Sequence, residues 1–496
     1  MDIFVSAVLG ELATRSMSLF IDRYSKKQAR TVEVNLESIL LRAQVIIDEA
    51  EGRHITNQAM LRQLSKLRDA MYQGYYVLDT FRYRAIKENK AEDHQVLNHS
   101  WNLSKFSYAK HLCLSSSSSS NSTETSQGLQ AEDVLNSLRT MVLDFHESIM
   151  FLTTYPRLHR QPYNMHLLLE KCMFGRQMEM ELVINFLLHT QPCINSLDRF
   201  DVLPIVGPGR SGKSTLVAHV CNDERVRDHF SQIAFFGNSN FRDEDIAILT
   251  DGCPIRHKQN KKLLIVFEVD GELSVDLWQC LCSLSKRLTA SGSKIIITSR
   301  SDKITKLGTR QALILKPLPH EAYWYFFKVI TFGSTNPEMH PRLAYLAMEI
   351  AKMLNGSLLA AHVISRLLGG NFNMNYWCKV LEFMRRSVAK HISMYGEHPC
   401  DLVDENKPTY MAMLGENSGE DLFISDTCSP QEEIPEITIQ DVVYGGVKPD
   451  GIFKILAWKS QIPPYHCYIY TCEIRKSQAR VFKRKRSLNN KCVSCG

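Results

Sequence analysis

Residues 202–215, VLPIVGPGRSGKST, constrain the fold of this chain more than any other stretch. The apolar, β-branched run over 202–206 predicts a buried parallel strand, and TLVAHVCN after the loop predicts a helix. Between them, Gly207, Gly212 and Lys213-Ser214 complete the G-x-x-x-x-G-K-[ST] spacing of a phosphate loop. The stretch therefore predicts a P-loop NTPase fold, a parallel α/β sheet covered by helices on both faces.

The residue types of the loop explain how it would hold a nucleotide. Glycines let main-chain N–H groups turn inward around phosphate oxygens without side-chain clashes. The Lys213 ammonium can reach the β- and γ-phosphates, the Ser214 hydroxyl can bind Mg²⁺, and the next helix N-terminus favours an anion. The candidate nucleotide-binding residues of the loop are Gly207, Gly209, Arg210, Ser211, Gly212, Lys213, Ser214 and Thr215.

Composition excludes several classes of protein. No apolar run approaches the roughly 18 residues of a membrane-spanning helix, and Asp2 stands where a signal peptide carries positive charge. The 14 cysteines lack the dense spacing of a secreted disulfide scaffold. Cys492 and Cys495 form one C-x-x-C without a second pair at zinc-ligand spacing. We therefore expect a cytoplasmic protein with no transmembrane segment.

The positive charge is concentrated at the end of the chain. Residues 475–496 contain eight basic and no acidic side chains, whereas the whole chain has a net charge of +6. Such a tail is typical of a nuclear localisation signal or of contact with an anionic membrane surface, and equally of a solvated tail. We expect no sequence-specific binding of nucleic acid.

Apolar spacing divides this α/β multidomain chain into four regions. Residues 1–160 carry four amphipathic stretches, which predict a four-helix bundle with a flexible, disordered Ser-rich loop at 113–127. Strands and helices alternate over 166–316, the predicted nucleotide-binding domain, and 317–392 forms a small helical subdomain. Residues 393–496 contain short β-like runs and receive no fold assignment. The strand candidates are 202–206, 233–236, 263–267 and 294–298.

Six stretches, in this order, resemble the plant intracellular immune receptors with an NB-ARC nucleotide-binding module and an Rx-type coiled-coil N-terminal domain. They are LRDAMYQGYYVLDTF (67–81), FGR (174–176), VCNDERVRDHF (220–230), GSKIIITSR (292–300), LKPLPHEAYWYFF (315–327) and LNGSLLAA (354–361). The resemblance as a whole covers residues 1–390. Each motif alone is weak, but six in order around a phosphate loop are specific to this family of disease resistance proteins.

The resemblance implies that the nucleotide is ADP or ATP and that it sets the orientation of the bundle against the nucleotide domain. It further implies that Phe174, Gly175, Arg176 and Leu358 flank the adenine and that Arg300 senses the γ-phosphate. The bundle would then contact other proteins, including other receptors of the class or a second copy of the chain.

The second nucleotide motif departs from the family pattern, which is an apolar strand ending in two aspartates. Here the strand reads LLIVFE over 263–268, so we assign Phe267 to the Mg²⁺-linked aspartate and Glu268 to the second acid. A phenyl ring cannot bind a metal, and a carboxylate one position along points to the other face of a strand. We therefore expect little or no hydrolysis, with Glu268 as the one candidate catalytic residue.

Other family features are changed or missing. Leu358 stands where the family has proline, and Tyr75 and Tyr76 replace an acidic pair of the bundle signature, which weakens its usual charge contact. We find no MHD-like triplet after the helical subdomain, and no leucine-rich period of about 20–30 residues.

Three functions remain open at this point. The first is a nucleotide-dependent conformational switch, or a truncated receptor partner, in plant defence without enzyme activity. The second is an active P-loop ATPase, which needs a carboxylate at the end of strand 263–267. The third is a pseudo-NTPase adaptor that no longer binds nucleotide, and the intact GKST argues against it.

Overall fold

The computed structural model describes residues 30–97, 120–158, 173–189, 201–237, 262–269, 292–413, 420–428, 434–443 and 446–476. The chain divides into two compact units, Met1–Met384 with Trp458–His466, and Arg385–Ala457 with Cys467–Gly496. Among the described helices, none combines the length and the apolarity that crossing a bilayer requires.

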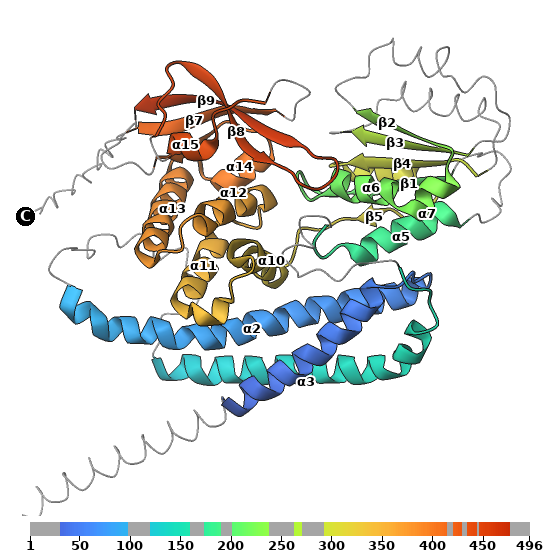
Figure 1. The fold of residues 1–496 in the computed structure, drawn as a ribbon, viewed down its shortest axis with the longest axis horizontal. Helices are drawn as coiled ribbons and strands as arrows, with labels where there is room; N and C mark the ends of the chain where they lie inside the picture. Colours follow the sequence, from blue (N-terminus) through green and yellow to red (C-terminus); the bar gives the residue numbers. More distant parts are fainter. Residues whose placement is uncertain are drawn as a thin grey trace, which may run out of the picture. The chain divides into compact units, whose positions relative to one another are not determined.

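Within the described residues, three helices form the N-terminal bundle. They are a helix over 30–51, α2 (Gln58–Leu97) and α3 (Ser120–Leu152), and α2 and α3 lie side by side (Figure 1). A Cβ on Gly74 of α2 would lie 2.7 Å from side-chain carbons of both Leu40 and Leu138, so this glycine lets the three helices approach closely. Most side chains of the predicted stripes within these helices are buried, among them Leu40, Leu64 and Leu138. The first stretch of the predicted four lies outside the described residues.

The start of α3 differs from the prediction. We expected a flexible loop over 113–127, but the helix begins at Ser120, and residues 113–119 lie outside the described ranges. The polar segment 120–127 is continuous with a helix that packing of Leu135 and Leu138 stabilises. Propagating an existing helix adds one hydrogen bond per residue without a new nucleation cost, so even Ser and Thr can extend it.

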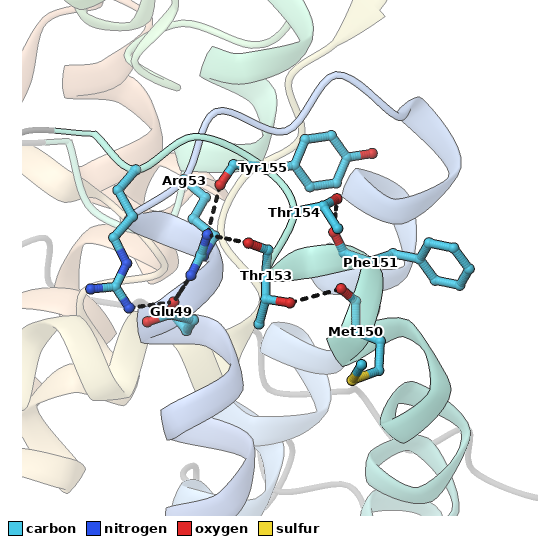
Figure 2. Close-up of polar contacts among 8 residues, drawn as sticks. Glu49, Arg53, Met150, Phe151, Thr153, Thr154 and Tyr155 are labelled. Atoms are coloured by element: carbon cyan, nitrogen blue, oxygen red, sulfur yellow. Dashed lines mark hydrogen bonds and ion pairs between the residues drawn. The ribbon is translucent and has the colours of Figure 1, made fainter.

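Arg53 joins two ends of the bundle that are far apart in sequence (Figure 2). Its buried guanidinium donates to the carbonyl oxygens of Thr153 (2.9 Å) and Tyr155 (2.6 Å) and also pairs with Glu49. It thereby binds carbonyls beyond the end of α3, where an intrahelical partner is lacking. The backbone of His54 donates to the Pro156 carbonyl nearby.

A five-stranded parallel sheet forms the nucleotide-binding domain, as the sequence predicts. The strands are β1 (Asp201–Val206), β2 (Gln232–Gly237), β3 (Leu263–Val269), β4 (Lys294–Ser299) and β5 (Leu313–Ile314), in the order β2-β3-β4-β1-β5. The helices of the first face are α5 (Gln177–Leu188), α6 (Lys213–Asn222) and α7 (Glu224–His229). Their apolar side chains share one core cluster with Leu203, Ile205, Leu264 and Val266. On the second face a separate cluster includes Ile304 of the short helix η5 (Asp302–Leu307).

The helical subdomain follows directly. Its elements are α10 (His320–Phe332), η6 (Pro337–Met339), α11 (Pro341–Met353), α12 (Leu358–Gly369) and α13 (Met374–Tyr395). Its core contains several large aromatic side chains, with Tyr323, Trp324, Phe327 and Trp377 at most 1% exposed. The Trp377 Nε1–H donates to the Asn371 carbonyl at 2.8 Å, so this buried indole is satisfied.

The second unit contains the sheet of the C-terminal region, for which the sequence predicted only short β-like runs. Its elements are α14 (Pro399–Asp404), β6 (Thr409–Ala412), β7 (Glu420–Cys428), α15 (Ile439–Val443), β8 (Ile452–Lys459) and β9 (Cys467–Lys476), with the strand order β6-β7-β9-β8. The pairs β6–β7 and β7–β9 are antiparallel. Residues 477–496, with Cys492, Cys495 and most of the basic tail, lie outside the described residues.

Candidate functional site

The phosphate loop joins β1 to α6 in a conformation that only glycine fits at two positions. A Cβ on Gly207 would lie 2.4 Å from the Leu315 carbonyl oxygen, and one on Gly212 would lie 2.5 Å from the Met173 Cε. Gly212 also has a φ of 90°, a backbone conformation that residues other than glycine rarely adopt. The backbone of the loop is therefore determined by its packing against the chain on both sides.

The groups around the loop are suited to an anion. Gly212 is the N-cap of α6 and supplies no side-chain acceptor, so no capping side chain stands at this helix N-terminus, an end that favours an anion. The buried Ser211 Oγ has no hydrogen-bond partner among the described residues. Lys213 Nζ donates to the carbonyls of Gly207 (2.8 Å) and Pro208 (2.7 Å). A phosphate would satisfy the hydroxyl and the N–H groups together, so the residues present fit a nucleotide.

Strand register places two further candidates beside the loop. Val206 of β1 pairs with Ser299 of β4, so Arg300 follows the strand end next to Gly207, and its side chain is exposed. Glu268 of β3 pairs with Thr298 of β4 at the same edge. In a parallel sheet this edge, at the carboxyl ends of the strands, is where ligands bind. The register thus places Arg300, Glu268 and the loop at the same edge of the sheet.

Phe267, which stands at the position of the family's Mg²⁺-linked aspartate, lies in the core on the second face of the sheet. Its side chain is 1% exposed, packs in the core cluster of the second face and lies 5.3 Å from the Phe236 ring. The face that α6 covers receives Leu264 and Val266 instead. Because side chains alternate along a strand, Glu268 belongs to the α6 face. The sequence alone could not show which set of alternate residues in β3 lies on the α6 face.

Val269 follows Glu268 and returns to the opposite face. It is 6% exposed and belongs to the same cluster as Phe267. Glu268 itself is half-buried. The carboxyl end of β3 therefore presents one acidic side chain on the α6 face, where the family pattern has two consecutive acids.

The segment Met173–Arg176 lies between the phosphate loop and the bundle. Met173 Cε occupies the space beside Gly212, as described above, and Gly175 has a φ of 62°. Arg176 Nη1 donates to Glu179 at 3.2 Å, and its other terminal nitrogen donates to the Lys316 carbonyl. These contacts agree with a segment that borders the nucleotide, whereas contact with the base itself stays a prediction.

Phe174 has neighbours that the sequence did not predict. Its ring centroid lies 5.4 Å from that of Tyr72 in α2, 5.3 Å from that of Phe326 in α10 and 6.2 Å from that of Tyr325. Burial raises the pKa of Tyr72 well above its usual value, so this phenol stays neutral. Phe174 is therefore a contact between the bundle, the helical subdomain and the residues bordering the loop.

Leu358 is the first residue of α12 and is half-buried. Its helix is capped by Ser357, whose hydroxyl accepts from the Ala360 N–H at 3.3 Å, while the Ser357 carbonyl accepts from the Tyr323 hydroxyl at 2.8 Å. The capping explains why α12 begins here. The predicted contact of Leu358 with the adenine stays a prediction.

The bundle signature makes a charge contact that the sequence analysis missed. Asp79 of α2 is 4% exposed and accepts hydrogen bonds from Trp324 Nε1 (2.8 Å) and Lys328 Nζ (2.5 Å) of α10. The two tyrosines that replace the acidic pair add ring contacts, Tyr75 with Tyr325 at 5.3 Å and Tyr76 with His320 at 5.1 Å. One carboxylate and two aromatic rings thus hold this interface, and the weakening of the family's charge contact stays a prediction. The sequence signal for this contact was Asp79 itself, an acidic residue within the apolar stripe of α2.

Comparison with known proteins agrees with this architecture. The Rx N-terminal domain family matches residues 4–118. Disease resistance protein RGA2 of Solanum bulbocastanum is 24% identical over 361 residues, which cover 67% of this chain and 34% of that protein. Putative disease resistance protein At1g50180 of Arabidopsis thaliana is 23% identical over 394 residues, 73% of this chain and 43% of that protein. The chain thus spans less than half of the length of either relative.

Among solved structures, Drosophila ORC bound to DNA overlaps with 46% of this chain and 68% of its own at 12% identity, with a TM-score of 0.31. An overlap this limited says nothing about function. The N-terminal family match and the sequence relatives, in contrast, agree with the six motifs and the order of the described elements. Residues 4–118 thus match the Rx N-terminal domain family, and the chain is similar in sequence to plant disease resistance proteins over 67% to 73% of its length.

Proposed function

We propose that the protein binds ADP or ATP at its phosphate loop and uses the bound nucleotide to set the position of the bundle against the rest of the first unit. One observation carries this proposal: Met173 contacts Gly212 of the loop, and the next residue, Phe174, contacts Tyr72 of the bundle. A ligand shifts a conformational equilibrium only through its different affinities for the two states. Because Met173 and Phe174 are adjacent, a different position of the bundle would change the packing of the loop and so the affinity for nucleotide.

The nucleotide would be held mainly by backbone groups. Ser211, Ser214 and the N-terminus of α6 would bind the phosphates, with Lys213 exchanging its loop carbonyls for phosphate oxygens. Arg300 at the β4 end is suited to a γ-phosphate. Ser214 and Glu268 are the candidates to hold Mg²⁺, which supplies charge neutralisation when bound.

We further propose that hydrolysis is slow. Phosphoryl transfer depends on positioning the attacking water as well as on the metal, and Phe267 replaces one of the two acids of the family pattern. The alternative of an active ATPase is favoured by Glu268 itself, which faces the α6 side of the sheet. Glu268→Gln separates the two: it should leave an already low turnover within about twofold, whereas a loss of tenfold or more would establish the ATPase.

The cellular role we propose is plant defence, because the relatives are disease resistance proteins. The bundle would contact other proteins, among them other receptors of the class or a second copy, once it is released. We place the protein in the cytoplasm, with the basic tail as a candidate nuclear or peripheral membrane signal.

The test is mass spectrometry of small molecules released from the purified protein. We expect ADP in the unmodified chain and its loss in Lys213→Ala. Lys306→Ala is the matched control, since this lysine is exposed on the second face of the sheet. Equal ADP content in all three proteins, or none in any, would refute the proposed binding site.

A further inference from the structure

We propose that a cavity between the bundle and the sheet of the first unit binds a small organic anion with an apolar body. The cavity has a volume of about 560 Å³, which is within the range of pockets that enclose drug-sized ligands. Residues 207–215, all within the described ranges, do not line it, so it is separate from the phosphate loop. The proposal therefore does not depend on the proposed nucleotide binding.

One part of the cavity lining is apolar. Leu203 of β1 and Val183 of α5 line it and are buried, and Leu182, Phe186 and Leu313 add half-buried side chains. Apolar side chains gain free energy when a hydrocarbon or aromatic group covers them and displaces water. The lining therefore favours a ligand whose body is apolar.

The polar part of the lining is positively charged. Arg62 of α2 and Arg310, just before β5, both line the cavity, and none of the described lining residues is acidic. Asp201 Oδ2 lies 4.0 Å from Arg310 Nη2, but it also lies 3.5 Å from Nζ of the buried Lys294. Two cations thus share one carboxylate, and Arg62 adds a further positive charge. A carboxylate, sulfonate or phosphate group on the ligand would balance this excess, because a guanidinium offers paired N–H donors to such oxygens.

The beginning of α2 adds to the preference for an anion. Gln58, the first residue of α2, lines the cavity, and the first turn of this helix contains no acidic side chain. Arg62 stands one turn further along the same face. The N-terminal end of a helix carries a partial positive charge, so the helix and the arginine favour the same sign of ligand.

The walls of the cavity are positioned by hydrogen bonds within the protein. Asn185 Nδ2 donates to the Ile55 carbonyl at 2.9 Å, which joins the turn before α2 to α5. Lys294 Nζ donates to the carbonyl of His189, directly after α5, at 2.7 Å. Asn185 also lines the cavity, and its buried Oδ1 has no hydrogen-bond partner among the described residues. Walls that are already positioned lose little conformational entropy on binding, and a donor group on the ligand would supply the missing partner.

Two fluorescent probes test the site in the full chain: anilinonaphthalene sulfonate and N-phenylnaphthylamine. They share the same ring system, and only the first carries a sulfonate. Arg62→Gln should weaken the sulfonate probe about threefold to tenfold, because the lost charge contact is partly open to solvent, and should change the neutral probe less than about twofold. Fluorescence titration of each protein with each probe gives the four affinities.

Arg42→Gln is the matched control, since this arginine is exposed on the helix over 30–51 and does not line the cavity. Ala312→Trp places a large ring in the lining and should weaken both probes at least about tenfold, while the urea midpoint checks that each variant is folded. Equal affinity of the sulfonate probe for the unmodified chain and for Arg62→Gln would overturn the site. Displacement of the probe by ADP would also overturn it, by locating the probe at the phosphate loop. Equal weakening of both probes by Arg62→Gln would refute the anionic class of ligand.

Discussion

The phosphate loop and the interface between α2 and α10 hold their polar groups in opposite ways. In the loop, backbone geometry does the positioning, and the Ser211 hydroxyl has no partner among the described residues. In the interface, the carboxylate of Asp79 satisfies the indole of Trp324 and the ammonium of Lys328, and all three groups are at most 13% exposed.

The difference separates a binding site from a structural contact. Buried polar groups are normally paired, and a bound ligand would supply the partner that the buried Ser211 hydroxyl lacks among the described residues. An interface whose groups pair with one another is complete already. Nucleotide binding would thus act at the loop, whereas the α2–α10 interface is the contact that must open when the bundle moves. Four changes test this division, in order of expected effect.

The largest effect is expected on the face of the sheet away from the loop. Phe267→Asp should destabilise folding by at least about 4 kcal/mol, because it removes a buried ring and places a carboxylate in an apolar cluster. Urea unfolding measures this, and Phe267→Leu, which keeps the apolar volume, should cost less than half as much. A folded Phe267→Asp protein that hydrolyses ATP faster would return Phe267 to the nucleotide site.

Next is the interface itself. Asp79→Ala should cost about 3 kcal/mol, because it leaves the Trp324 N–H and the Lys328 ammonium with no acceptor in a poorly hydrated place. Hydrogen exchange in α2 and α10 reports the opening. Asp79→Asn retains an acceptor for Trp324 and should lose less. Unchanged exchange in both variants would mean that the aromatic contacts alone hold the interface.

At the loop we expect an effect on binding and not on folding. Lys213→Ala should weaken ADP about tenfold to hundredfold, corresponding to the loss of a charged hydrogen bond worth about 1.5–3 kcal/mol. Its urea midpoint without nucleotide should stay close to that of the unmodified protein. Calorimetric titration gives the affinity, and a large change in folding stability would show that the lysine is structural instead.

The smallest effect is a pH dependence. In the unfolded state His362 has its ordinary pKa of 6.5, whereas burial in the folded state lowers its pKa to about 3. The stability is therefore complete above about pH 6.5 and falls with pH below it, by about 1.4 kcal/mol per pH unit. His362→Phe keeps a ring against Trp458, whose ring centroid lies 4.1 Å from that of His362, but cannot titrate. If the free energy of unfolding changes equally between pH 7 and 5 in the unmodified protein and in His362→Phe, His362 does not cause the pH dependence.

Local patterns in the sequence were enough for several parts of the molecule. The phosphate loop, four of the five parallel strands and the apolar stripes of the bundle depend on residues close together in the chain. Glycine positions, runs of branched residues and spacings of three and four report backbone geometry directly. The position of Arg300 beside the loop also followed, because it ends a predicted strand of a parallel sheet.

Tertiary structure decided the rest. Which of Phe267 and Glu268 faces the loop depends on where α6 packs, since alternation defines two faces but does not say which one a helix covers. The partner of Asp79 lies 245 residues away, and the ring contacts of Phe174 come from α2 and α10 together. The antiparallel sheet of the C-terminal region likewise needed pairing between distant strands. Contacts at long sequence separation are selected by packing of the whole chain, and no local pattern encodes them.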